Sequence, residues 1–171
     1  ATVYRLFSSK HGILKALLDT GIVGDDQDVP MARRPDVQTL LAEPDPIRQL
    51  AGFVTVTVQV NTRVAPLYWI LVSAAGTDPD AAVLLDQLTG QRQQGQRMLA
   101  ATLHEAGALR PELAEQDAAD LIHALLSPEM YRLLVIDRRW TVDRYEHWLA
   151  GTIADQLLPP GPIAPTGRRH P

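Results

Sequence analysis

Apolar residues recur three and four positions apart along most of the chain, which is the period of an amphipathic α-helix. Residues 10–23 show this pattern, with Ser9 placed to cap the first turn and Gly24 placed to end the helix. A shorter helical segment over residues 1–7 comes before it and ends at Ser8. The pattern predicts one short helix and one longer helix at the start of the chain.

Residues 24–45 interrupt the periodicity with a polar segment that contains Pro30, Pro35 and Pro44. Such a composition is typical of a connection between helices. Within it, residues 36–42 have enough apolar positions for one short helix. We therefore expect a long loop that contains one short helix over residues 36–42.

Sequence signals for the start of a helix occur at several points in the rest of the chain. The pairs Asp45-Pro46, Asp78-Pro79 and Ser127-Pro128 each place a capping side chain before a proline, whose missing N–H costs nothing at the first helical position. Together with the apolar spacing, they predict the following helices: residues 46–65, 67–75, 79–106, 117–126, 128–139 and a last helix from residue 141 onward.

Residues 54–60 read VTVTVQV, an alternation of β-branched and polar residues that by local rules favours a strand. The helical template also fits, because Leu50, Val54, Val58 and Asn61 lie three or four positions apart. No hairpin turn or second strand follows, and a lone strand would leave its backbone edges unpaired. We therefore predict a helix here and an all-α fold for the chain.

The composition excludes several classes of protein. The sequence has no cysteine, so it has no disulfide framework, no thiolate zinc site and no cysteine nucleophile. Its longest apolar stretch, residues 64–75, contains a proline and is shorter than the roughly 20 residues that span a bilayer. We expect a cytoplasmic protein that makes no membrane contact.

Charge is placed unevenly along the chain. Arg5, Lys10 and Lys15 make the first 18 residues basic, whereas the whole sequence carries a net charge of −4. A basic N-terminal segment on an otherwise acidic chain suggests that this segment faces a polyanion. A solvated helix face explains the same three charges equally simply.

Candidate catalytic residues are poorly arranged. None of the five histidines belongs to an HExxH motif or lies three or four residues from another histidine. The sequence also has no glycine-rich phosphate loop and no nucleophile elbow. We expect no metal site and no cofactor, and an enzyme is the less favoured hypothesis.

The first ten residues, ATVYRLFSSK, followed by an apolar helix, resemble the end of the helix-turn-helix in the tetracycline-repressor-like (TetR) family of bacterial transcriptional regulators. On a short helix Val3, Leu6 and Phe7 can face the core while the polar residues project toward a duplex. The resemblance implies operator DNA as a partner. The residues expected to contact it are Ala1, Thr2, Tyr4, Arg5 and Lys10.

A second resemblance to the family covers residues 118–135, Trp140 and residues 144–149, which are similar to the last two helices of its effector domain. Those helices form a four-helix bundle with a second subunit in family members, so the resemblance implies a homodimer. The residues expected at the interface are Leu121, Leu125, Tyr131, Leu134, Tyr145, Trp148, Leu149 and Ile153. Packing inside one subunit is an equally simple explanation of these apolar positions.

Family members carry two helices before the recognition helix, whereas this sequence begins inside that helix. We therefore expect an incomplete regulator, in which residues 1–23 are the remnant of the DNA-binding domain with its connecting helix. Residues 24–158 are expected to form the ligand-binding and dimerisation domain. The proline-rich residues 159–171 are expected to form a disordered tail.

The resemblance also implies an effector site among the central helices, for a small molecule whose charge the sequence does not identify. Candidate lining residues combine apolar bodies with a few polar groups. They are Phe53, Thr57, Asn61, Tyr68, Trp69, Gln91, Gly95, Met98 and Thr102. Residues 91–97 lack any apolar side chain in mid-helix, but Gln91 and Gly95 are in phase with Leu84, Leu88 and Leu99, which favours an inward position for both. For Gln93, Gln96 and Arg97, a solvated stretch of the long helix is at least as good an explanation.

Together these features predict a ligand-responsive DNA-binding regulator, a repressor that its effector releases from the operator by moving residues 10–23. The rival hypothesis is a standalone helical module that binds a small molecule or dimerises without binding DNA. A helical enzyme is the third.

Overall fold

The computed structural model describes residues 10–23 and 34–160, and all regular secondary structure in these ranges is helical. The helices are α2 (Lys10–Val23), α3 (Pro35–Leu41), α4 (Pro46–Ala75), α5 (Pro79–Glu105), α6 (Glu115–Leu125), α7 (Pro128–Tyr131), the π-helix η2 (Arg132–Asp137) and α8 (Val142–Leu157). The predicted all-α class is confirmed for the described part of the chain.

Side-chain caps begin the helices where the sequence predicts them. Asp45 accepts hydrogen bonds from the backbone N–H groups of Ile47 and Arg48, and Asp78 does the same for the first turn of α5. Residues 54–60 lie inside α4, so the prediction of a helix for the alternating segment is confirmed. Burial of Val54 and Val58 on one face of α4 outweighs the weak local preference of β-branched residues for strands.

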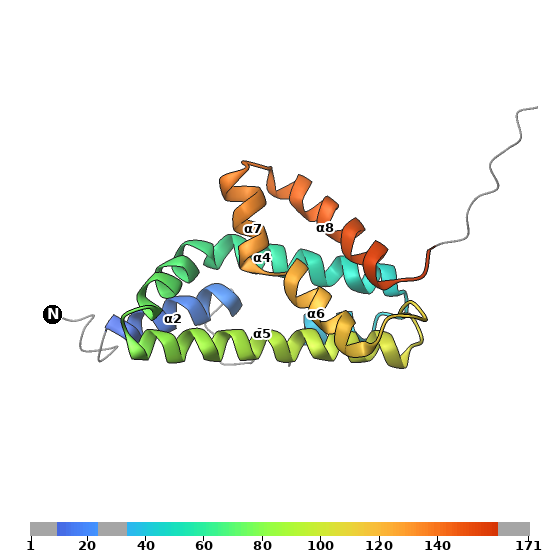
Figure 1. Ribbon diagram of the computed structural model, residues 1–171, viewed down its shortest axis with the longest axis horizontal. Helices are drawn as coiled ribbons and strands as arrows, with labels where there is room; N and C mark the ends of the chain where they lie inside the picture. Colours follow the sequence, from blue (N-terminus) through green and yellow to red (C-terminus); the bar gives the residue numbers. More distant parts are fainter. Residues whose placement is uncertain (1–9, 24–33, 161–171) are drawn as a thin grey trace, which may run out of the picture.

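Proline 66 does not separate two helices, so the predicted break between residues 65 and 67 is wrong. Pro66 lies inside α4 with its ring exposed. A proline removes one backbone hydrogen bond and bends a helix, but packing on both sides of it holds α4 together. Figure 1 shows α4 bending toward α5 in its C-terminal part.

The predicted helix over residues 128–139 is also not regular. A four-residue α7 passes into the wider turn of η2, in which Arg138 N–H donates to the Leu133 carbonyl at 3.1 Å. The chain then reverses at Arg139, whose φ of 57° lies in the left-handed region.

The two longest helices, α4 and α5, run antiparallel and form the body of the molecule (Figure 1). α8 packs along α4, and α6 packs on α5 and α8. α2 packs on α4 near the turn that joins α4 to α5, at the end of the molecule away from the last turn of α8 (Figure 1). No helix in residues 10–23 and 34–160 has both the length and the apolar character needed to cross a membrane.

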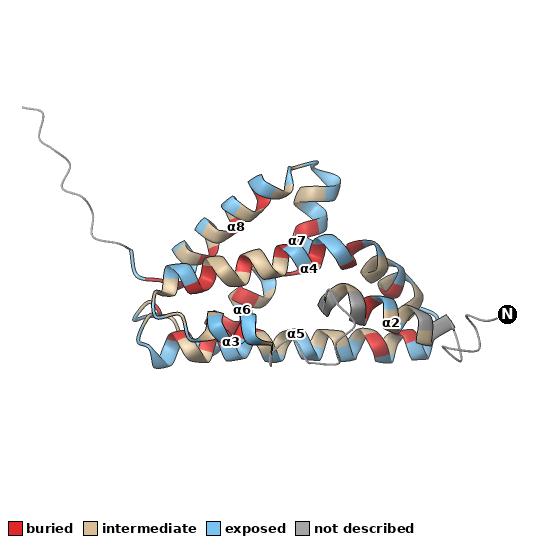
Figure 2. Ribbon diagram, turned by 180° about the vertical axis from the view of Figure 1, so that it is seen from behind, coloured by how far each residue is buried: buried red, intermediate tan, exposed pale blue. Residues whose placement is uncertain are grey.

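Two separate clusters of buried side chains form the core. The larger cluster joins the first half of α4 to the end of α5, α6 and α8. The smaller cluster contains Leu18 of α2, Val64 and Leu71 of α4, and Ala81 and Leu84 of α5. Figure 2 shows the buried positions on the sides of these helices that face one another.

Half of the predicted dimer interface belongs to the core of the chain itself. Tyr131, Tyr145, Leu149 and Ile153 are each at most 3% exposed and pack in the larger cluster, with the rings of Tyr131 and Tyr145 edge to face at 5.5 Å. Their expected contact with a second subunit is therefore wrong. Leu121, Leu125, Leu134 and Trp148 are partly exposed.

A close approach fixes α2 on α4. A Cβ atom placed at Gly21 would lie 2.8 Å from Cγ1 of Val64, which is shorter than side chains tolerate. The Gly21 carbonyl also accepts a hydrogen bond of 2.8 Å from Nε of Arg63. Glycine is required here because α2 rests directly on the buried Val64 side chain.

We predict that Gly21→Ala lowers the free energy of unfolding by about 1–3 kcal/mol, because Val64 is β-branched, buried and unable to yield. Gly151→Ala in α8 is the matched control: a Cβ there meets nothing within 4 Å, so the helix gains about 0.5–1 kcal/mol. Denaturant unfolding measures both. Equal stabilisation by the two substitutions would contradict the close approach.

Candidate ligand-binding cavity

A cavity of about 250 Å³ lies where the two core clusters meet. Leu18 and Val64 of the smaller cluster and Leu99 and Leu126 of the larger cluster all form part of its wall. The remaining lining residues are Val37 and Leu41 of α3, Phe53, Val56, Thr57, Val60, Asn61 and Tyr68 of α4, Leu88, Thr89, Gln91, Arg92, Gly95, Gln96 and Met98 of α5, and Pro128.

The cavity follows from the sequence of α5. No apolar side chain stands between Leu88 and Met98, so the helix cannot continue the core across this stretch. Gly95 adds to the gap, since a Cβ atom at this position meets nothing within 4 Å. The missing side chains leave space that α4 and α2 do not fill.

The cavity has room for a small organic molecule. An apolar cavity of about 150 Å³ is enough to bind benzene, so this one holds a ligand of about ten non-hydrogen atoms. Its wall combines many apolar side chains with a few polar groups, which is the usual construction of small-molecule sites.

Most residues predicted to contact a ligand line this cavity: Phe53, Thr57, Asn61, Tyr68, Gln91, Gly95 and Met98. Two others lie elsewhere. Trp69 packs against Tyr68 and under the guanidinium of Arg132, 4.3 Å from its ring centre. Thr102 lies farther along α5, where its hydroxyl donates to the Met98 carbonyl. Ala1, Thr2, Tyr4 and Arg5 are outside the described residues, as is the side chain of Lys10.

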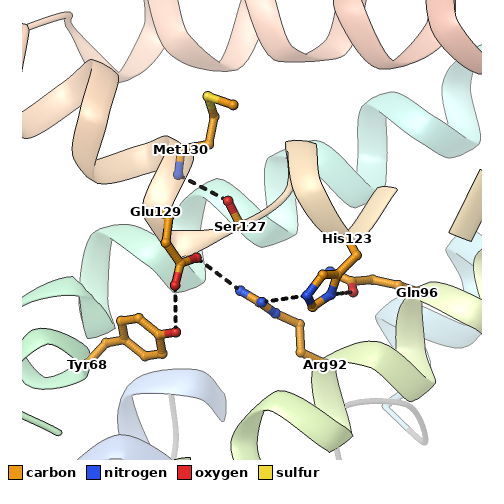
Figure 3. Close-up of polar contacts among 7 residues, drawn as sticks. All are labelled: Tyr68, Arg92, Gln96, His123, Ser127, Glu129 and Met130. Carbon is orange, nitrogen blue, oxygen red and sulfur yellow. Dashed lines mark hydrogen bonds and ion pairs between the residues drawn. The ribbon is translucent and has the colours of Figure 1, made fainter. Parts of the chain in front are cut away.

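A group of polar side chains from four helices borders the cavity, and we call it the Arg92 cluster. Its members are Tyr68, Arg92, Gln96, His123 and Glu129 (Figure 3). Arg92 of α5 reaches both α6 and α7, with Nη2 3.2 Å from His123 Nε2 and Nη1 3.8 Å from Glu129 Oε2. The cluster therefore ties α5 to α6 and α7 beside the cavity.

The contacts of His123 determine its tautomer. A guanidinium only donates, so His123 Nε2 must accept from Arg92. The proton then resides on Nδ1, which donates to Gln96 Oε1 at 2.7 Å. Burial and the positive charge of Arg92 lower the pKa of His123, so the imidazole is held neutral.

Tyr68 and Glu129 form the other side of the cluster. The Tyr68 hydroxyl donates to Glu129 Oε1 at 2.9 Å. Burial and this hydrogen bond raise the pKa of Tyr68 to about 12, so the phenol remains a donor at neutral pH. The cluster as a whole is uncharged, because the Arg92 and Glu129 charges cancel.

Several buried N–H groups at the cavity wall lack acceptors. Asn61 is 4% exposed, and its Nδ2 has no hydrogen-bond partner among the described residues. Nε and Nη1 of Arg92 are also buried without such a partner, and the ion pair of Nη1 with Glu129 is too long for a hydrogen bond. Three buried N–H groups of Asn61 and Arg92 beside the cavity therefore lack an acceptor among the described residues.

The sequence analysis did not identify Arg92, Gln96, His123 or Glu129 as site residues. The polar run at residues 91–97 indicated an unusual turn of helix, but the partners of Arg92 come from α6 and α7, far along the chain. Their convergence depends on the turn at Ser127-Pro128, where Ser127 Oγ accepts from the Met130 N–H (Figure 3).

No group of His, Asp and Glu side chains in residues 10–23 and 34–160 is arranged to hold a metal ion. Comparisons with protein-family models, with curated proteins and with solved structures found no match to this chain.

We predict that Asn61→Leu raises the free energy of unfolding by about 1–3 kcal/mol, because it removes a buried donor that lacks a partner and the adjoining cavity has room for the bulkier side chain of the same branching. Gln59→Leu, at an exposed position of the same helix, is the control and should change stability by less than about 0.5 kcal/mol. Urea unfolding distinguishes the two. A clear loss of stability in Asn61→Leu would show that the amide is already satisfied.

The Arg92 cluster also predicts a dependence of stability on pH. The folded pKa of His123 lies below its ordinary value of about 6.5, so the unfolded chain binds more protons in the interval between the two. Its contribution to the free energy of unfolding is therefore complete above about pH 6.5 and is lost as the pH falls toward the folded pKa.

Unfolding of the wild type and of His123→Gln, measured between about pH 7.5 and 5, tests this prediction. We expect a shallower loss of stability in His123→Gln, because its neutral amide can still accept from Arg92. The exposed His147 of α8 provides the control substitution, His147→Gln. Parallel curves for wild type and His123→Gln would contradict the neutral imidazole.

Proposed function

We propose that this protein is a ligand-responsive DNA-binding transcriptional regulator of the TetR-like type, a repressor that acts in the cytoplasm. The observation that supports it best is that α2 forms part of the cavity wall. Leu18 of α2 is 1% exposed and lines the cavity opposite α4 and α5. The helix that directly follows the DNA-binding-like tip is thus in a position to sense the ligand.

The coupling is mechanical in this proposal. α2 is fixed to α4 through Gly21, so it moves as α4 moves, and Leu18 borders the space that the ligand takes. In this proposal α2 has two positions relative to the larger cluster. A ligand that binds more tightly to one of them increases the population of that position. Moving α2 changes the placement of residues 1–9, which carry the proposed phosphate and base contacts of Thr2, Tyr4 and Arg5.

A homodimer belongs to the same proposal, since an operator with two half-sites needs two recognition helices. The interface is proposed on the outer surfaces of α6, η2 and α8, where Leu121, Leu125, Leu134 and Trp148 are partly exposed. Leu133 and Ile136 of η2 are about half exposed and extend this apolar surface.

Selection of bound sequences from random DNA, with the full-length protein as its gene encodes it, tests the function. We expect one enriched sequence with two-fold symmetry, and compounds from a screen that reduce its binding. Absence of any enriched sequence would contradict the regulator and favour a standalone ligand-binding module.

Two glycines of α5 allow a matched test of the cavity. Gly95→Leu places a side chain in the cavity, whereas Gly90→Leu places the same side chain on the exposed side of the same helix. Both substitutions replace a glycine of α5 with leucine, so the change in intrinsic helix propensity is the same in the two variants. We predict that an effector no longer changes operator affinity in Gly95→Leu but still does so in Gly90→Leu, as measured by fluorescence anisotropy of labelled operator. A full response in both variants would place the effector outside the cavity.

A further inference from the structure

We propose that the cavity binds a compact, mostly apolar and uncharged molecule that carries a carbonyl-type oxygen, such as a ketone, ester or lactone, and that this oxygen accepts a hydrogen bond from Asn61 Nδ2. The inference rests on the proposed function, because it names the chemical class of effector for the same cavity.

The apolar side chains of the cavity wall indicate a ligand with a mostly apolar body. Phe53, Val60, Leu88 and Leu99 are among the apolar lining residues, and Leu18 lines the cavity from α2. Such a wall gains free energy by removing apolar ligand surface from water and offers little to a strongly hydrated molecule.

The acceptor oxygen follows from the unpaired donors. Asn61 is the one asparagine of the sequence, and it places an N–H without an acceptor in the buried wall. Arg92 adds two further buried N–H groups without acceptors. A ligand oxygen that accepts from one of these groups restores a hydrogen bond that the unliganded wall does not make.

The absence of charge on the ligand follows from the Arg92 cluster. Among the described residues that line the cavity, Arg92 alone carries a formal charge, and Glu129 Oε2 stands 3.8 Å from its Nη1. His123, on the other side of Arg92, is neutral because its Nε2 accepts from the guanidinium. A carboxylate in the cavity therefore adds an uncompensated negative charge to apolar surroundings, and a carbonyl oxygen adds none.

Three probes of about ten non-hydrogen atoms, matched to the size of the cavity, separate these possibilities: propiophenone, butylbenzene and phenylacetate. Selective labelling with [15N]asparagine gives one side-chain NH2 pair, from Asn61. We expect propiophenone to bind at least about tenfold more tightly than the other two, which corresponds to about 1.4 kcal/mol. We also expect it to shift the Asn61 NH2 proton resonances downfield, which butylbenzene does not do.

Asn61→Leu should reduce the preference for propiophenone over butylbenzene to less than about twofold, while the exposed Gln59→Leu keeps the tenfold preference. Equal binding of propiophenone and butylbenzene to the wild type would overturn the hydrogen bond. Tighter binding of phenylacetate would overturn the uncharged ligand, and failure of all three to bind would overturn the whole class.

None of these outcomes decides the proposed function. An effector of a different chemical class that still releases the operator would leave the regulator intact while this inference fails. If the protein selects no operator but binds propiophenone through Asn61, this inference stands and the proposed function fails.

Discussion

The stretch of α5 between Leu88 and Met98, where apolar side chains are absent, is the constraint on which the rest of the structure depends. A helix that runs through the centre of an all-helical chain normally contributes an apolar side chain at every turn. Here the contribution stops for more than two turns, so the core divides into two clusters with a cavity between them. The same stretch supplies Arg92 and Gln96, which hold α6 and α7 through His123 and Glu129.

This division places the cavity next to α2, the helix that is proposed to respond to a ligand. α2 belongs to the smaller cluster, which it shares with the C-terminal part of α4 and the start of α5. The helices of the larger cluster, with α8 buried along one side, form the more extensive core. A ligand between the clusters contacts both, so its binding can favour one arrangement of the smaller cluster over another. Because Leu18 lines the cavity, α2 takes part in that response in the proposed mechanism.

The sequence predicted most of the helices because their ends are encoded locally. Asp45 and Asp78 cap the helices that they precede, and the bounds of α2 follow from its apolar spacing. The predicted break at Pro66 was wrong because a helix that packs against its neighbours on both sides of a proline tolerates one missing backbone hydrogen bond.

The site was predictable in part. Thr57 and Asn61 were predicted because they lie on the central helices and combine apolar bodies with polar groups, and Gly95 because of its phase on a long helix. All three line the cavity. The Arg92 cluster was not, because the Tyr68–Glu129 hydrogen bond joins residues 61 positions apart and depends on how four helices pack. The apolar stripe of α8 could not reveal whether it faced its own core or a second chain, and burial of Tyr145 shows that it faces its own core. Residues 1–9, which carry most of the proposed DNA contacts, lie outside the described residues.

The central claim is that filling the cavity moves α2 relative to the larger cluster. The chain has no cysteine, so spin labels can be attached through Leu17→Cys on α2 and Gln156→Cys on α8, both exposed positions. The distance between them is measured by pulsed electron paramagnetic resonance in protein diluted with unlabelled chains, with and without a ligand that shifts the Asn61 resonances. The account predicts that the distance changes by about 1–2 Å or more on binding. An unchanged distance with the cavity occupied would contradict it.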